Sequence, residues 1–254
     1  PGKIAAFLKP CDTYSFQQLC KEHRIQRAAV YAVAVQCEGM CDIEQIKSQA
    51  KAPLAVREEG ETLVVETLYG EKRLPRQMVL AERCCSCKTK KMACYDELLG
   101  EDGADCGESR MDGVRRLEAM TPEERFHFWQ GELSRCIRCN ACRNVCPACS
   151  CEKCVFDNPA SGVENKAAAN SFEENLFHII RAFHVAGRCT DCGECSRVCP
   201  QHIPLHLLNR KLISDMNALY GPYQAGADLE SRPPMTDFRY DDPEPHAGGR
   251  GGAQ

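Results

Sequence analysis

Two cysteine runs with the same spacing constrain this chain more than any other feature of its sequence. Both runs read C-x2-C-x2-C-x3-C-P, the first over residues 136–147 and the second over residues 189–200. Together they use eight of the 20 cysteines in the 254-residue chain. Buried free cysteines act as small hydrophobic residues and need no such repeated spacing. The repeat therefore indicates that these cysteines act as thiolate ligands.

Thiolates at this spacing are typical of paired 4Fe–4S clusters. Three cysteines separated by two residues each wrap a loop around three iron corners of one cube. The fourth cysteine, before the proline, reaches the other cube. The spacing predicts two ligand sets that exchange one cysteine: Cys136, Cys139, Cys142 and Cys199 for one cluster, and Cys189, Cys192, Cys195 and Cys146 for the other. Zinc sites use pairs of Cys-x2-Cys knuckles, and disulfides need an oxidising compartment, so both are weaker interpretations.

Composition excludes several classes of protein. A net charge of −4 argues against general binding to nucleic acid or to an anionic membrane surface. No apolar run reaches the ~18 residues of a membrane span, and the first residues lack the layout of a signal peptide. We therefore expect a cytoplasmic protein with reduced thiols rather than a secreted disulfide scaffold.

Helical patterns surround the two motifs. A capping box at Thr121–Glu124 opens a predicted helix that runs to Ser134. A second box at Ser171–Glu174 opens another, whose predicted apolar stripe is Phe172, Leu176, Ile179, Ile180 and Phe183, and Gly187 is its expected C-terminal cap. Pro204 opens a third, with the stripe Leu205, Leu208, Leu212, Met216 and Leu219. Residues 121–220 resemble the alpha-helical ferredoxin module of succinate dehydrogenase, fumarate reductase and heterodisulfide reductase subunits. That resemblance implies electron relay without substrate binding.

Basic residues and histidines lie close to the motifs. The basic ones are Arg135, Arg138, Arg143, Lys153, Arg188 and Arg197. Cations beside an anionic cluster would raise its potential, and a solvated basic face is an equal alternative. His178 and His184 are interpreted as core or surface residues, whereas His202 and His206 could tune a cluster.

The N-terminal half predicts a small α/β layer, so the fold class is α+β. Expected strands cover residues 3–8, 28–35 and 62–68, and expected helices cover residues 14–23 and 42–49. The first strand begins almost at residue 1, so we expect additional N-terminal sequence or a partner that completes the sheet. The predicted domains are an α/β domain over residues 1–115, a dicluster domain over 116–222, and an extended or disordered arm over 223–254.

A further group of cysteines predicts a third metal site. Cys84/Cys87 and Cys151/Cys154 are Cys-x2-Cys pairs that together make a four-thiolate set. An alternative set draws Cys11, Cys37 and Cys41 together with Cys84 and Cys87. A third iron–sulfur cluster, a zinc ion and no metal all stay open for this group.

Four short motifs carry a second resemblance: K-P-C-D at 9–12, Q-C-E-G at 36–39, R-C-C-S-C-K at 83–88 and Y-D-E-L-L-G at 95–100. They resemble the beta subunits of deazaflavin-reducing hydrogenases and dehydrogenases and the A subunit of anaerobic sulfite reductase. Residues 143–154 are similar to members of this group that accompany heterodisulfide reductase-like complexes in anaerobes. With the C-terminal module, the resemblance covers about residues 3–240. It implies an electron-carrying subunit of a flavin-linked hetero-oligomer.

The sequence therefore predicts a non-catalytic redox relay. Electrons would pass between a flavin-containing dehydrogenase or hydrogenase partner and heterodisulfide reductase-like subunits, in an anaerobic and potentially electron-bifurcating complex. Flavin is expected in the partner, because the chain has no glycine-rich dinucleotide fingerprint after a strand. The alternatives are a flavin-dependent reductase that performs the terminal reduction itself, and an iron–sulfur redox sensor.

Overall fold

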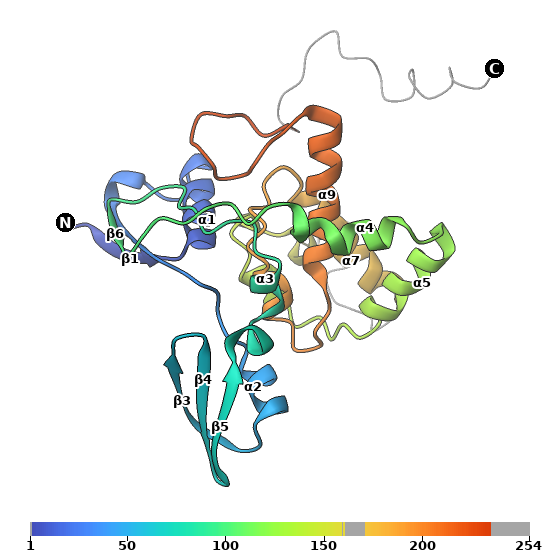
Figure 1. Ribbon diagram of the computed structural model, residues 1–254. Helices are drawn as coiled ribbons and strands as arrows, with labels where there is room; N and C mark the ends of the chain where they lie inside the picture. Colours follow the sequence, from blue (N-terminus) through green and yellow to red (C-terminus); the bar gives the residue numbers. More distant parts are fainter. Residues whose placement is uncertain (1, 159, 161–170, 235–254) are drawn as a thin grey trace.

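A parallel three-stranded sheet forms the N-terminal layer of the computed structural model, which describes residues 2–158, 160 and 171–234 (Figure 1). Its strands are β1 (Ile4–Leu8), β2 (Val30–Val35) and β6 (Glu97–Leu99), in the order β1-β2-β6. Helix α1 (Pro10–Lys21) covers one face, where Phe16 packs on Ala32. The strands at residues 3–8 and 28–35 are confirmed, and β6 was not predicted.

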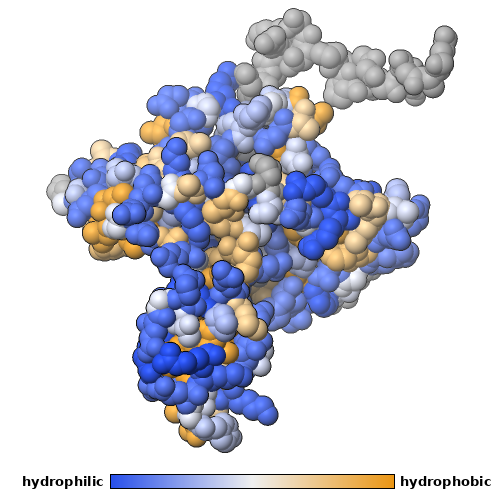
Figure 2. All heavy atoms as spheres, viewed as in Figure 1, coloured by the Kyte–Doolittle hydropathy of each residue, from blue (hydrophilic) through white to orange (hydrophobic). Residues whose placement is uncertain are grey.

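The other face of this sheet is open to solvent. Phe7 and Tyr31 both lie on this face. Phe7 is in register with Val33 of β2, and Tyr31 lies two residues before Val33, so all three side chains point to the same side. Phe7 is 68% exposed, and Leu99 of β6 is 44% exposed. Figure 2 shows apolar surface over this region. Parallel sheets are usually covered on both faces, so one face here lacks its usual cover among the described residues.

An antiparallel sheet follows, and it projects below the rest of the molecule in Figure 1. Its strands are β3 (Pro53–Glu59), β4 (Thr62–Thr67) and β5 (Gly70–Pro75), and α2 (Ile43–Gln49) packs on it through Ile46. The predictions of α2 and β4 are confirmed. The sequence did not predict β3 and β5, because both are polar strands with mostly exposed residues and show no clear apolar alternation.

Most of the remaining regular elements are helices: α3 (Glu82–Cys85), α4 (Asp112–Glu118), α5 (Pro122–Leu133), α6 (Ala141–Asn144), α7 (Ser171–His184), α8 (Glu194–Arg197) and α9 (Leu205–Tyr220). Thr121 caps α5, since its hydroxyl accepts from Glu124 N at 3.2 Å. The predicted capping box of α7, with Phe172, lies outside the residues whose side chains are described. Helix α4 runs across the boundary predicted between residues 115 and 116, and its Val114 packs with Ile213 of α9.

The buried faces of α7 and α9 match the predicted apolar stripes only at some positions, such as Leu205, which is 1% exposed, and Ile180, which packs on the helical core. Leu176, Ile179 and Phe183 are 37%, 44% and 58% exposed. Among the α7 residues whose burial is described, the buried ones are instead Phe177, His178, Arg181 and Ala182. On α9, Leu219 is 72% exposed, whereas the polar Asn209 and Arg210 are buried. Both helices therefore turn polar side chains inward, toward the cysteine loops. No helix in the described ranges is long and apolar enough to cross a membrane.

The chain after α9 folds back onto α1. Gln17 Nε2 donates to Ala227 O at 2.9 Å, and Lys21 Nζ donates to Ser231 Oγ at 2.9 Å. Gly226 has a φ of +72°, and a Cβ at this position would lie 2.0 Å from Tyr14 O. The first part of the predicted arm therefore packs on this chain itself, and the rest of the arm, residues 235–254, lies outside the described residues.

This close approach predicts the effect of a small substitution. Gly226→Ala should lower the free energy of unfolding by about 1–3 kcal/mol, because the new methyl group forces the arm away from α1. Gly60→Ala is the matched control, with a φ of +60° and no atom within 4 Å of its Cβ position. It should cost ~1 kcal/mol through backbone strain alone. Equal losses in urea denaturation would contradict the importance of the contact.

Candidate metal centres

Four cysteines line a small cavity, here called the first cage. They are Cys136, Cys139, Cys142 and Cys199. The cavity encloses about 20 Å³ and is closed by Phe177, Ile203 and Leu205, which belong to the largest apolar core of the helical part. Three of these cysteines come from the first run and one comes from the second run.

A second cage mirrors the first. It also encloses about 20 Å³, and its cysteines are Cys146, Cys189, Cys192 and Cys195. The structure therefore brings together the four cysteines of each predicted set, with the cysteine before each proline at the cage of the other run. The binding of iron at these residues stays a prediction.

The two loops have the same backbone shape. Arg138 and Asn140 have φ of 52° and 61°, and Asp191 and Gly193 at the equivalent positions have φ of 59° and 70°. These left-handed residues coil each loop tightly, and Arg138 N donates to Cys136 Sγ at 3.4 Å. At Gly193 a side chain is also excluded by space, because a Cβ would lie 2.7 Å from Arg83 Cβ. Loop closure thus depends on residues between the cysteines as well as on the cysteines.

Two buried side chains reach the sulfur atoms. His178 Nε2 lies 3.2 Å from Cys136 Sγ, and Asn209 Nδ2 donates to Cys195 Sγ at 3.6 Å. Burial, with the positive charges of Arg181 and Arg138, lowers the pKa of His178 to about 3. The neutral ring can therefore donate one N–H to the sulfur. His178 was interpreted as a core or surface residue, because nothing in its sequence neighbourhood shows which face of α7 meets the cage.

Arg181 of α7 supplies a buried positive charge between the cages. Its side chain is almost fully buried, and Nη2 donates to Cys142 O at 3.2 Å. Burial disfavours the cation, but the nearby thiols Cys195, Cys146 and Cys142 together raise the pKa of Arg181 above its ordinary value. Sequence reasoning missed this residue because it lies ten residues after the start of a helix, away from the cysteine runs.

Cys146 is prepared to act as a thiolate. A hydrogen bond from the Cys149 thiol, assisted by Arg181 and by the backbone N–H groups of Ala148 and Cys149, lowers the pKa of Cys146 to about 6, although burial opposes this shift. Metal ligands of this type must lose their proton. The environment of Cys146 therefore suits the role predicted for it.

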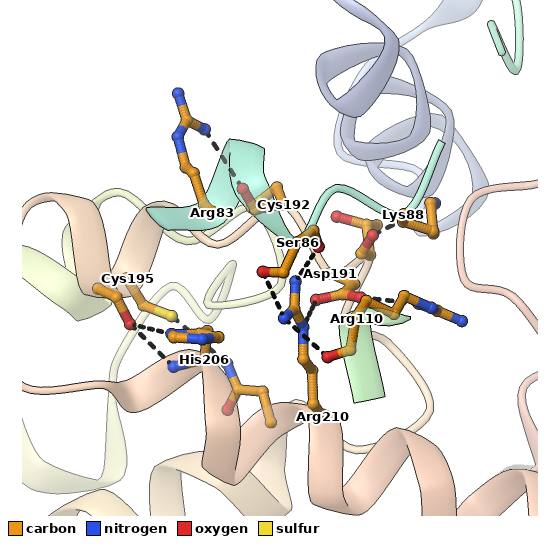
Figure 3. A network of polar contacts seen from close by, with 12 residues as sticks. Arg83, Ser86, Lys88, Arg110, Asp191, Cys192, Cys195, His206 and Arg210 are labelled. Atoms are coloured by element: carbon orange, nitrogen blue, oxygen red, sulfur yellow. Dashed lines mark hydrogen bonds and ion pairs between the residues drawn. The ribbon is translucent and has the colours of Figure 1, made fainter. Parts of the chain in front are cut away.

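A buried ionic network fastens the second loop to the rest of the chain (Figure 3). Asp191 accepts from Arg210 Nε and from Arg110 Nη1, both at 2.7 Å. Arg210 also donates to the hydroxyl and the carbonyl of Ser86, each at 2.8 Å. Arg83 donates to Cys192 O at 3.3 Å and forms an ion pair with Glu194. The segment around Cys84–Cys87 is therefore held against the second cage by its polar neighbours.

The cysteines predicted for a third site do not meet as a four-thiolate set. Cys151 and Cys154 line a larger cavity together with Cys149, and Cys84 and Cys87 are absent from its walls. Cys84 Sγ instead accepts from Met40 N at 3.3 Å, near Cys41, and Cys87 lies beside Cys106. Cys11 lies near Arg83 and Cys192. Cys37 follows β2 by two residues. Arg83, next to Cys84, forms an ion pair with Glu194 of the second loop, whereas Arg188 pairs with Glu22 and donates to Ser150, next to Cys151.

In the described parts of the chain, no set of ligand side chains converges on a single metal ion. No group of three or more His, Cys, Asp or Glu side chains there could hold one metal ion. A cubane binds each thiolate at a separate iron corner, so its ligands surround a volume and do not meet at a point.

The Asp191 network predicts a large loss of stability when one member is removed. Arg210→Met should lower the free energy of unfolding by roughly 3–5 kcal/mol, because Asp191 and Ser86 lose buried partners. Arg57→Met is the control, since Arg57 pairs with Glu59, Glu66 and Glu71 at the exposed surface. It should change the free energy of unfolding far less in the same urea titration, because exposed ion pairs contribute little to stability. A similar cost for both would contradict a structural role for the network.

The sequence of the chain is similar to those of known proteins. Residues 132–203 match a family model described as a 4Fe-4S dicluster domain. The chain is 24% identical over 294 residues to the F420-dependent formate dehydrogenase subunit beta of Methanocaldococcus jannaschii, covering 92% of this chain and 76% of the relative. It is also 24% identical over 297 residues to the F420-dependent formate dehydrogenase 1 subunit beta of Methanococcus maripaludis, with the same coverage. The chain thus carries a 4Fe-4S dicluster domain, and the predicted resemblance to deazaflavin-linked beta subunits is confirmed.

Proposed function

We propose that this chain is the electron-transfer subunit of a deazaflavin-linked dehydrogenase complex and holds one 4Fe–4S cluster in each cage. Cys136, Cys139, Cys142 and Cys199 would hold the first cluster, and Cys189, Cys192, Cys195 and Cys146 the second. The observation that carries this proposal is the cysteine lining of the two cages, three from one run and one from the other. The dicluster match over residues 132–203 supports it independently.

The residues around the cages fit an anionic group. When bound, such clusters accept and donate single electrons. Arg181 places a buried positive charge beside cysteines of both cages. His178 and Asn209 direct N–H groups at Cys136 and Cys195. Hydrogen bonds to sulfur and nearby cations favour the reduced form, which carries one more negative charge, and so raise the potential.

The cages differ in their exposure, which suggests which cage lies at each end of the relay. Cys139 of the first cage is exposed, and the neighbouring Ile137 is 61% exposed. The second cage faces the N-terminal part, where Ser15 of α1 lies 3.0 Å from Thr190. Electrons would therefore leave or enter at the first cage and connect to the N-terminal layer through the second.

The expected partners of this chain are the other subunits of a dehydrogenase complex. The relatives are named as subunits of formate dehydrogenases, so we expect a hetero-oligomer with a dehydrogenase partner that carries the flavin. The exposed apolar residues Phe7, Ile179 and Phe183 offer surface for such contacts. For the other end of the relay we propose a heterodisulfide reductase-like module in the cytoplasm, from the resemblance of residues 143–154 alone. This arrangement would suit electron bifurcation.

The spectrum of the purified, anaerobically reconstituted chain tests the relay. We expect a broad thiolate-to-iron absorption band without flavin peaks, and at least about eight iron atoms per chain. Flavin peaks would favour a reductase that performs its own chemistry. Fewer than about eight iron atoms would contradict the presence of two clusters.

The exchange of Cys146 and Cys199 between the two cages predicts which cysteine variants have similar spectra. Cys146→Ser should damage the cluster held by Cys189, Cys192 and Cys195, because Cys146 lies at that cage. Its electron paramagnetic resonance spectrum should therefore match that of Cys192→Ser and differ from that of Cys139→Ser. A match to Cys139→Ser would show that each run holds its own cluster.

Arg181 should control the midpoint potentials. Arg181→Met should lower both by roughly 60 mV, a tenfold change in the equilibrium constant for one electron. Arg181→Lys keeps the charge and should shift them less. Arg197→Met is the surface control, since Arg197 is a more exposed cation paired with Glu194. Unchanged potentials in Arg181→Met, or equal shifts in Arg197→Met, would contradict the assignment.

A further inference from the structure

Two cysteines outside the cages, Cys87 and Cys106, bring their sulfur atoms into contact and are called here the thiol pair. The Cys87 thiol is hydrogen-bonded to the Cys106 sulfur. Cys87 is half-buried, whereas Cys106 is exposed. Neither cysteine is among the residues that line the two cages or the larger cavity at Cys151 and Cys154. The fold has therefore placed two free thiols together away from the proposed ligand sets.

A short antiparallel contact of the backbone holds the thiol pair together. Thr89 pairs with Asp105 in an isolated bridge. Next to this bridge, Cys106 N donates to Lys88 O at 3.1 Å, and Lys88 directly follows Cys87 in the chain. The contact between the two sulfur atoms thus depends on paired backbone segments rather than on side chains alone.

Both segments that carry the thiol pair also bear on the second loop (Figure 3). Ser86 precedes the first thiol of the pair, and it accepts two hydrogen bonds from Arg210, each at 2.8 Å. Arg110 follows the second thiol by four residues and donates to Asp191 at 2.7 Å. Arg210 donates to the same carboxylate. A covalent bond between the two segments would therefore restrain both sides of the network around Asp191.

We propose that Cys87 and Cys106 form a reversible disulfide when the chain meets a low-molecular-weight disulfide, and that this bond locks the two segments onto the second loop. The chain would thereby record oxidising conditions next to the second cage. Among proteins that otherwise keep their thiols reduced, disulfides are usually transient and serve in catalysis or redox sensing.

Thiol–disulfide exchange supplies the chemistry in two steps. The exposed Cys106, as the thiolate, attacks one sulfur of the reagent and expels the other half, so that a mixed disulfide forms. Cys87 then attacks the Cys106 sulfur and displaces the half that is still bound. One S–S bond forms in the chain and one breaks in the reagent. Two electrons and the two thiol protons pass to the reagent, which leaves as two thiols.

The other cysteines of this segment have different neighbours. Cys84 Sγ accepts from Met40 N at 3.3 Å, and Cys85 Sγ donates to Leu80 O at 3.8 Å. Pairing with Cys106 is therefore expected of Cys87 and not of these two. The disulfide needs no iron in either cage, so its formation does not rest on the proposed function.

Disulfide mapping of the full chain tests the bond. The reduced chain is treated anaerobically with oxidised glutathione, the remaining thiols are alkylated, and peptides cut by trypsin and Glu-C are sequenced by mass spectrometry. We expect a Cys87–Cys106 linkage that dithiothreitol removes. Cys106→Ser should abolish this linkage. The matched control is Cys85→Ser, which removes another exposed thiol of the same segment and should keep it.

Hydrogen exchange of the same samples tests the lock. Amide exchange over residues 189–195 should be slower in the oxidised wild type than in the reduced wild type, and oxidation of Cys106→Ser should not slow it. A linkage with unchanged exchange would overturn the lock.

Three outcomes would overturn the disulfide itself. They are a Cys106 that stays open to alkylation after oxidation, a Cys106 linked to Cys84 or Cys85 as often as to Cys87, and a Cys87 that bound iron protects from alkylation in the reduced chain. None of these outcomes depends on whether the cages hold clusters, so a failure of the relay would be recognised separately by its iron content.

Discussion

Each cysteine cage in this chain is closed by a cysteine from the other run, and the rest of the helical part is arranged around that exchange. Cys199 completes the first cage and Cys146 completes the second. The two loops must therefore lie against each other before either cage is complete. Helices α7 and α9 then hold the loops from outside, through Phe177 and Leu205 at the first cage and Asn209 at the second.

Buried charge is the second organising factor. A cluster with four thiolates is anionic, and its burial needs nearby cations and N–H donors. Arg181 stands between the cages, whereas Arg210 and Arg110 compensate Asp191 in the second loop. The same network reaches Ser86, so the N-terminal segment is fixed to the second cage. This network therefore joins the second cage to the segment around Ser86.

The sequence predicted which cysteines meet better than it predicted the residues around them. Cysteine spacing is a local property, and it identified both ligand sets that the structure gathers around the cages. Apolar periodicity was less reliable. On α7 it favoured Leu176, Ile179 and Phe183, all of which are at least one-third exposed. The helix instead buries His178 and Arg181, because both make polar contacts with the cysteine loop of the first cage. A hydrophobic pattern cannot reveal such contacts.

The cysteines outside the two runs also show that a local sequence pattern does not reveal which residues meet in the fold. Two Cys-x2-Cys pairs look equivalent in the sequence, but the fold separates them, and only Cys151 and Cys154 reach the large cavity. Which cysteines meet depends on how the loop after the first run turns, and that turn depends on Arg143, Arg188 and Glu22. Long-range ion pairs of this kind carry no local sequence signature.

Anomalous diffraction at the iron edge, from crystals grown anaerobically, tests the central claim most directly. The account predicts iron in both cages, with Cys199 bound to iron of the first cage and Cys146 bound to iron of the second. Iron in a single cage, or each of these cysteines bound to the cluster of its own run, would contradict it.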